Sequence, residues 1–140
     1  MKYDDASWHY AGDFPADQPQ EHGGTHIALY IKWCFIKGWV GELHIEEAPE
    51  DVAHVISGKL SATEFFFRYC DGKFTDEDLS DAGNSFTQQY YGGDGLYLLD
   101  YVEHFGDLMY VAAESAHDFA KFSSILDARA ASGVLVTAKA

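Results

Sequence analysis

The sequence predicts a mainly α-helical fold: a single domain of five or six helices around one central apolar helix. Three observations favour this class. Apolar side chains recur three or four residues apart along several segments, a spacing typical of amphipathic helices. Capping residues or proline precede most of these segments, and glycine follows them. The chain has 140 residues, of which 47% are hydrophobic, so it can bury one core without disulfide bonds.

We expect one domain over residues 1–140, made of three parts. Residues 1–24 combine turn-forming glycine and proline with many aromatic rings, which predicts an ordered aromatic arm laid over the helices. Residues 25–133 make up the helical body. Residues 134–140 form a tail.

The central helix is expected over residues 25–38. Thr25 offers a side-chain oxygen for the N-cap, Lys37 lies in the last turn, and Gly38 fits the position after the helix. Apolar residues cover nearly the whole circumference, so this helix should be buried. The residues expected in the core are Ile27, Leu29, Ile31, Trp33, Phe35 and Ile36.

Two further helices are expected in the next part of the chain. One begins at Pro49, because proline is tolerated at the first helical position, and ends at Gly58. Its apolar stripe is formed by Val52, Val55 and Ile56. The other follows a capping-box pattern that runs from Ser61 to Glu64. The aromatic run after this pattern also fits a strand, but the capping box and the nearby Gly72 favour a helix.

The second half of the chain is expected to hold three more helices. One begins at Thr75, with apolar positions at Leu79, Ala82, Phe86 and Tyr90. A weaker helix covers residues 96–104, with apolar positions at Leu96, Leu99 and Val102. The last begins at Ser115 and ends near Gly133. A short pairing of residues 108–112 with 134–136 is the most β structure we expect.

The charge balance excludes two classes of partner. The chain has 9 Lys and Arg against 23 Asp and Glu, a net charge of −14, whereas nucleic acids and anionic membranes require a basic footprint. The most apolar run is about ten residues long, too short to span a membrane, and no signal-peptide pattern is visible. Cys34 and Cys70 lie in apolar surroundings, which favours buried reduced thiols over a disulfide bond and therefore a cytoplasmic protein.

No residue pattern indicates catalysis, a metal or a cofactor. His22 and His26 have the four-residue spacing of zinc peptidases, but the two glycines between them place His22 before the helix. The acidic residues after Thr75 lack the alternating ligands of an EF-hand loop. Neither cysteine lies in a nucleophile motif. We therefore expect a protein that is not an enzyme, with no catalytic residues and no bound metal or cofactor.

Acidic residues are concentrated in the second half of the chain. Between Asp71 and Asp118 the sequence has eleven carboxylates and one basic residue, Lys73. Such a run often only solvates helical faces, but an excess this large costs self-repulsion. We therefore expect a docking surface for a basic partner, with tyrosines among the carboxylates. Its members are Glu77, Asp78, Asp81, Tyr90, Tyr91, Asp94, Tyr97, Asp100, Tyr101, Glu103 and Asp107.

Three strings of this sequence are similar to a bacterial family of unknown function. They are KYDDASWHYAGDFP at residues 2–15, GGTHIALYIKW at residues 23–33 and CDGKFTDEDLSDAGNSFTQQYY at residues 70–91. The similarity runs in order from residue 2 to residue 131, and the tail beyond Ser132 departs from it. The family resembles the small acidic immunity proteins with which bacteria neutralise their own secreted toxins, including type VI effectors. The resemblance implies a protein that binds and occludes a cognate toxin.

An alternative interpretation is a small-molecule-binding or regulatory domain. Aromatic rings with polar tips can line a ligand pocket, although more often they form a core and its rim. The residues concerned are Trp8, His9, Tyr10, His26, Trp33 and Trp39.

Overall fold

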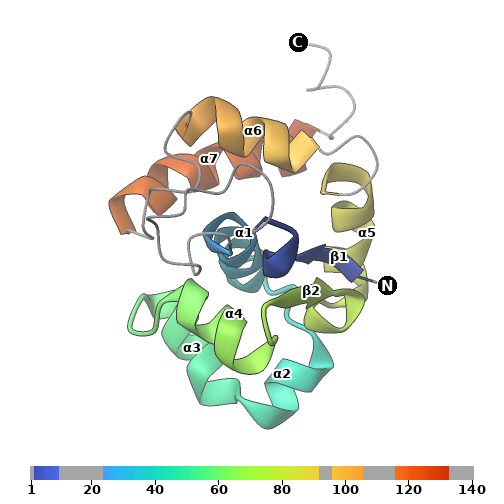
Figure 1. Cartoon of the computed structure of the whole chain (residues 1–140), viewed down its shortest axis with the longest axis vertical. Helices are drawn as coiled ribbons and strands as arrows, with labels where there is room; N and C mark the ends of the chain where they lie inside the picture. The colour runs from blue at the N-terminus through green and yellow to red at the C-terminus, as the bar shows by residue number, and fades with distance from the viewer. Residues whose placement is uncertain (1, 10–23, 92–95, 106–115, 133–140) are drawn as a thin grey trace.

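A computed structural model describes residues 2–9, 24–91, 96–105 and 116–132 (Figure 1). These residues form seven α-helices, two short 3-10 helices and one two-stranded antiparallel sheet, which confirms the mainly α single domain. In chain order the elements are β1 (Lys2–Asp5), η1 (Ala6–His9), α1 (Thr25–Ile36), α2 (Glu42–Glu47), α3 (Pro49–Ser57), α4 (Ala62–Tyr69), β2 (Lys73–Thr75), η3 (Asp76–Asp78), α5 (Asp81–Tyr90), α6 (Leu96–Phe105) and α7 (Ala116–Ser132). The helix without a sequence prediction is α2.

The central helix is α1, with α2, α3 and α4 on one side and α6 and α7 on the other (Figure 1). Every residue from Thr25 to Phe35 is buried, as the apolar circumference predicts. Even Lys32 is only 7% exposed. Its ammonium lies 4.5 Å from the centroid of the Phe119 ring, a cation–π contact that offsets part of its lost hydration. The expectation for Ile36 was wrong: it is 46% exposed, because it lies in the last turn, where the helix leaves the core.

The start of α1 differs from its prediction. Thr25 is the first helical residue, Gly24 occupies the N-cap position, and no side chain caps the helix. Thr25 is instead buried. Gly24 permits close packing here, because a Cβ atom at this position would lie 2.9 Å from the Phe67 ring.

At the end of α1, Gly38 follows its prediction, but the helix ends at Ile36, and Lys37 is the C-cap residue and does not lie in the last turn. Gly38 has a φ of 83°, a conformation that glycine adopts without strain. Its amide donates to the Phe35 carbonyl at 3.0 Å, and the amide of Trp39 donates to the Cys34 carbonyl at 3.0 Å. These two hydrogen bonds form a Schellman motif, so the carbonyls of the last turn are satisfied where the chain reverses.

The third helix, α3, has the predicted bounds. It begins at Pro49, and Gly58, with a φ of 87°, follows its last residue. Val52 and Val55 are buried, as the stripe predicts. Ile56 is 40% exposed. It directly follows Val55, so on a helix it points about 100° away from the buried face.

The aromatic run after Ser61 forms a helix, α4, and not a strand. The Ser61 hydroxyl accepts the Glu64 amide at 3.0 Å, as the capping box predicts. The Glu64 carboxylate pairs with Arg68 one turn later. Phe65 and Phe66 are buried, and α4 packs on α1 and α3.

The predicted helix start at Thr75 is a single 3-10 turn. The Thr75 side chain and the Asp78 carboxylate form a capping box around η3, but the chain is extended again at Leu79. Leu79 is buried and forms an antiparallel bridge with Val40, which requires extended backbone. The helix α5 therefore begins only after Ser80, whose hydroxyl caps it.

The sixth helix, α6, exists as predicted, but its buried face is not the predicted one. Leu99 is 60% exposed and Val102 is 40% exposed. The buried residues are Tyr97, Asp100 and Tyr101. This face turns inward because the two rings pack against Phe122 of α7, and Asp100 forms an ion pair with Arg129 of the same helix.

The last helix, α7, packs on α1 and α6. Phe119, Phe122 and Leu126 are its buried apolar residues. The predicted helix limits at Ser115 and Gly133 lie outside the described residues.

The sheet joins the beginning of the chain to its middle. β1 pairs antiparallel with β2, so that Asp4 lies opposite Phe74. Tyr3 is half-buried, its ring lies 5.0 Å from the Phe74 ring, and its hydroxyl donates to the Asn84 side chain at 2.8 Å. The start of the aromatic arm is therefore packed on the helical body. The pairing expected between residues 108–112 and 134–136 lies outside the described residues, as do residues 10–23 of the aromatic arm.

Both cysteines are free and buried, as expected. Cys34 lies inside α1, and burial raises the pKa of its thiol. Cys70 follows the last turn of α4 and lies in a polar cluster described below.

Candidate functional site

The structure divides the predicted docking surface into exposed and buried residues. Glu77, Asp81 and Glu103 are exposed. The buried members are Asp78, Tyr90, Tyr97, Asp100 and Tyr101. Tyr91 is half-buried, while Asp94 and Asp107 lie outside the described residues. The expectation was therefore wrong for the five buried residues, which cannot contact a partner at the surface of this fold.

The tyrosines are buried because they surround Tyr30 of α1. The Tyr97 ring meets the Tyr30 ring edge-on at 4.8 Å, and the Tyr91 ring does so at 5.0 Å. The Tyr90 hydroxyl donates to Asp100, which raises the pKa of Tyr90 together with a larger contribution from burial. The Tyr90 hydroxyl is therefore a structural hydrogen-bond donor inside the core.

Asp100 is buried because its charge is paired. It is 7% exposed and accepts two hydrogen bonds from the Arg129 guanidinium, at 2.9 Å from Nε and 2.8 Å from Nη2. These two hydrogen bonds raise the pKa of the Arg129 guanidinium above its ordinary value. Asp100 thus joins α6 to α7 and does not add to the surface charge.

The sequence string at the start of the chain also contributes buried residues to the interior of the protein. Asp4 is 7% exposed, accepts the Tyr91 hydroxyl and lies 3.3 Å from Nε2 of the buried His26. The Ala6 amide donates to the Gly72 carbonyl at 2.8 Å. The described start of the first string, residues 2–9, and the string at residues 70–91 are therefore packed against each other.

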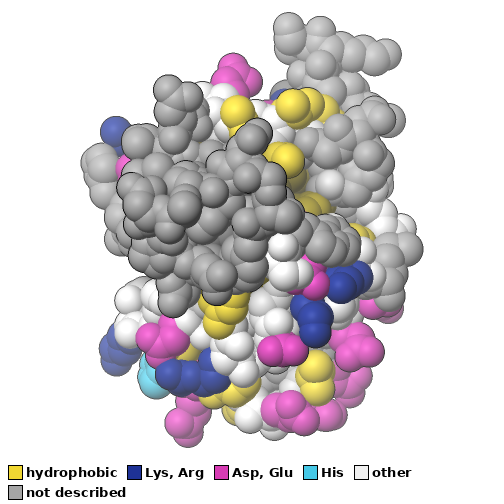
Figure 2. All heavy atoms as spheres, in the orientation of Figure 1, with side chains coloured by type: hydrophobic (Ala, Val, Ile, Leu, Met, Phe, Trp, Pro, Cys, Tyr) yellow, Lys and Arg dark blue, Asp and Glu magenta, His cyan; other side chains and the backbone are white. Residues whose placement is uncertain are grey.

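An acidic groove lies between α2 and the chain from η3 to the start of α5. Its volume is about 530 Å³, and its lining is Val40, Glu42, Leu43, Ile45, Glu77, Leu79, Ser80 and Asp81. Leu43 is 39% exposed and Ile45 is 54% exposed, so the groove presents apolar surface beside its three carboxylates. Acidic side chains gather at the end of the molecule that carries α2 (Figure 2). Glu77 and Asp81 are the members of the predicted docking surface that line this groove.

The two walls of the groove are tied together by backbone hydrogen bonds. The Gly41 amide donates to the Asp78 carbonyl at 3.0 Å, and the Ser80 amide donates to the Trp39 carbonyl at 3.1 Å. The chains approach so closely that a Cβ atom on Gly41 would lie 2.2 Å from the Glu77 carbonyl oxygen. The groove therefore has a fixed shape.

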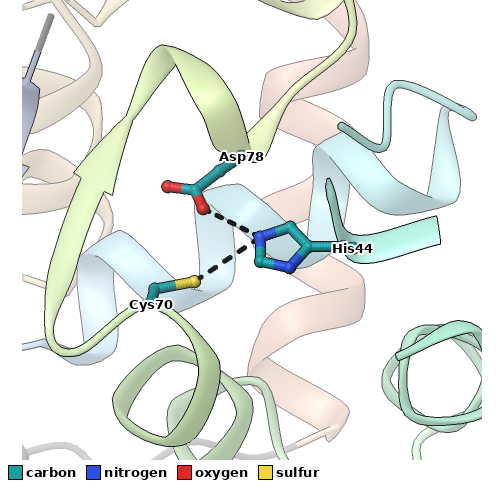
Figure 3. A group of neighbouring side chains, drawn as sticks. All are labelled: His44, Cys70 and Asp78. Carbon is teal, nitrogen blue, oxygen red and sulfur yellow. Dashed lines mark hydrogen bonds and ion pairs between the residues drawn. The ribbon is translucent and has the colours of Figure 1, made fainter. Parts of the chain in front are cut away.

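Beneath the groove, His44, Cys70 and Asp78 point toward one another from α2, the end of α4 and η3 (Figure 3). His44 Nε2 lies 2.8 Å from Asp78 Oδ1 and 3.8 Å from Cys70 Sγ. The other carboxylate oxygen of Asp78 accepts the Thr75 amide at 2.8 Å. All three side chains of the cluster are at most 9% exposed.

The cluster does not activate Cys70 as a nucleophile. A relay of the protease type needs the thiol and the carboxylate on different imidazole nitrogens, whereas both lie against Nε2 of His44 here. Burial raises the pKa of Cys70 well above its ordinary value, and the facing Asp78 carboxylate raises it further. The thiol therefore stays protonated, and the chemistry open to the three donors is hydrogen bonding or metal binding.

Sequence reasoning missed this cluster. His44 precedes Cys70 by 26 residues and Asp78 by 34 residues, spacings without a motif. The available signal was the Thr75 capping box, because Asp78 occupies its third position and must turn its side chain inward.

One comparison with known proteins identifies the family. The family model for a domain of unknown function, DUF7832, matches residues 2–115. The chain belongs to the DUF7832 family. Neither a curated protein nor a solved structure matches it. The DUF7832 match includes β1, the acidic groove and the His44 cluster.

Among the rings of the alternative interpretation, the three that the structure describes, Trp33, Trp39 and His26, do not line the groove of this DUF7832 chain. Trp33 is buried and packs edge-on against Trp39, with ring centroids 5.5 Å apart. His26 is fully buried. The side chains of Trp8 and His9, and all of Tyr10, lie outside the described residues. Within the part of the chain that the structure describes, no helix is both long and apolar enough to cross a membrane.

Proposed function

We propose that this chain is an acidic immunity protein that binds a basic antibacterial toxin and occludes its active site, without catalysis of its own. The observation that carries the proposal is the acidic groove, where Leu43 and Ile45 lie exposed beside Glu42, Glu77 and Asp81. Apolar side chains supply the buried area of an interface, and the surrounding carboxylates select a cationic partner.

The overall charge supports the same partner. A net charge of −14 attracts a basic protein over about one Debye length, roughly 8 Å at physiological salt, and so accelerates its association. A toxin that acts on nucleic acid has a basic cleft for its polyanionic substrate. An acidic protein seated in that cleft excludes the substrate by direct competition.

The fixed shape of the groove supports binding without rearrangement. Its walls are held by the Gly41 and Ser80 hydrogen bonds and by the His44–Asp78 pair. A preorganised surface loses little conformational entropy on association. The proposal places the protein in the bacterial cytoplasm, where a toxin delivered by a type VI system would act.

Co-expression with the product of the neighbouring gene tests this proposal. We expect that product to kill cells when expressed alone, and cells that also express the DUF7832 chain to survive. The two proteins should then co-purify in a 1:1 complex. A neighbouring product that is harmless alone and does not co-purify would contradict the immunity function.

A further inference from the structure

We propose that His44, Cys70 and Asp78 form a binding site for a single Zn²⁺ ion. The first observation is the convergence of three donor types that zinc uses in proteins: an imidazole nitrogen, a thiolate and a carboxylate oxygen. The three donor atoms all lie within 4.8 Å of one another. Figure 3 shows that they come from three separate elements and face a common point.

The donor separations are close to those of a tetrahedral site. Zinc bonds of about 2.0–2.3 Å place neighbouring ligand atoms about 3.3–3.6 Å apart. The separations from His44 Nε2 are 2.8 Å to Asp78 Oδ1 and 3.8 Å to Cys70 Sγ. They lie on either side of the tetrahedral value, and all three donor atoms lie within 4.8 Å of one another, so small side-chain shifts would bring them onto one ion. The fourth position is left to water, as in other zinc sites with three protein ligands.

The charges of the three donors also match a divalent ion. Zinc binds the neutral imidazole of His44 through Nε2, the thiolate of Cys70 and the carboxylate of Asp78. When Zn²⁺ binds, the Cys70 thiol therefore releases its proton to solvent. The two negative ligands then neutralise the two positive charges of zinc, so the buried site has no net charge.

The surroundings hold the donors in place. Asp78 Oδ2 accepts the Thr75 amide, which leaves Oδ1 turned toward His44. The His44 ring packs against Phe35 and Phe65, with ring centroids 5.9 Å and 5.2 Å away. Hydrogen bonds and packing around a ligand fix its orientation and raise metal affinity. Zinc at this site would cross-link α2, the end of α4 and η3.

Cobalt substitution tests the site, because tetrahedral Co²⁺ bound to a thiolate has a sulfur-to-metal charge-transfer band in the near ultraviolet. We expect metal-free full-length protein to develop this band with one equivalent of Co²⁺, and Zn²⁺ to abolish it. The Cys70→Ser variant should lack the band. Cys34→Ser is the matched control, because Cys34 is also a buried free thiol but lies outside the cluster. It should keep the band.

Thermal unfolding gives a second readout that does not depend on cobalt. Excess Zn²⁺ should raise the Tm of the wild type and of Cys34→Ser, because the site exists only in the folded state. Circular dichroism checks that the Cys70→Ser variant folds. If Cys70→Ser does not fold, the Asp78→Asn variant is used in its place. A wild type with no cobalt band and no zinc-dependent Tm would show that the cluster is a hydrogen-bonded structural element only. A band that persists in folded Cys70→Ser would also overturn the site.

Discussion

His44 and Asp78 lie 34 residues apart, and their 2.8 Å hydrogen bond joins the two walls of the acidic groove. His44 belongs to α2, which carries Leu43 and Ile45, the exposed apolar side chains of the groove. Asp78 ends η3 and directly follows Glu77, a carboxylate of the opposite wall. Both residues are buried, so a hydrogen bond in the interior of the protein helps to hold the shape of the surface groove.

Replacement of Asp78 by alanine should destabilise the protein strongly. The change leaves the buried His44 imidazole and the Thr75 amide without their acceptor. Unpaired buried donors of this kind cost about 2–4 kcal/mol of unfolding free energy in total. Glu77→Ala is the control, because it removes an exposed carboxylate one residue earlier and should cost less than about 0.5 kcal/mol. Urea unfolding of the two variants measures the difference, and equal stabilities would contradict this role of Asp78.

Replacement of Gly41 by alanine should be more damaging than replacement of Gly38. A Cβ atom on Gly41 would lie 2.2 Å from a backbone oxygen of the opposite groove wall, so the walls must separate. We expect a loss of about 3 kcal/mol or more. Gly38 has open space around it but a φ of 83°, so alanine there costs only the backbone strain, about 1–2 kcal/mol. If Gly41→Ala were the more stable of the two variants, the close approach of the walls would be wrong.

Replacement of Asp100 by alanine should cost far more than replacement of Glu103, three residues later on α6. Asp100→Ala leaves the Arg129 guanidinium largely buried without its counterion, which costs about 3–5 kcal/mol. Glu103 is exposed, and Glu103→Ala should change stability by less than about 0.5 kcal/mol. Thermal or urea unfolding distinguishes the two residues. A larger effect for Glu103 would mean that α6 faces the other way.

Stability should fall in acid partly through Asp127. Hydrogen bonds from the Lys37 ammonium and the Trp33 indole lower the pKa of Asp127 below its ordinary value. A carboxylate whose pKa is lower in the folded state adds stability above its unfolded pKa of about 3.9 and loses it as the pH falls through the folded pKa. The difference in unfolding free energy between the wild type and Asp127→Asn should therefore shrink from pH 6 toward about pH 2. A constant difference over that interval would contradict the contribution of ionised Asp127.

Helix limits were predictable where a local signal sets them. Proline at the start of α3, serine before α4 and glycine after α1 and α3 act through their own backbone geometry, so the sequence shows them directly. The inward face of α6 was not predictable in this way. Asp100 is buried because Arg129 lies opposite, a partner 29 residues away that the apolar spacing of Leu99 and Val102 does not reveal.

The candidate site was predictable only in part, for the same reason. The run of carboxylates between Asp71 and Asp118 predicts that the site is acidic, and it includes two of the groove carboxylates, Glu77 and Asp81. The groove itself depends on α2, a six-residue helix without a strong apolar pattern. Its contact with η3 is made by His44, whose partners lie 26 and 34 residues away. Long-range pairing of this kind decides which acidic residues lie at the surface and which lie in the core.

The most direct test of the acidic groove as the docking site is the affinity of the chain for the toxin proposed as its partner. It is measured with charge reversals inside and outside the groove. The groove variant, Glu77→Lys/Asp81→Lys, reverses the charge of two groove carboxylates. The control variant, Glu50→Lys/Glu103→Lys, reverses two exposed carboxylates outside the groove lining and changes the net charge by the same amount. We predict that the groove variant folds but binds at least about tenfold more weakly, a loss of about 1.4 kcal/mol, and fails to protect cells. The control variant should bind within about threefold of the wild type, because it loses only long-range attraction. A folded groove variant that binds and protects like the wild type would contradict the acidic groove as the docking site.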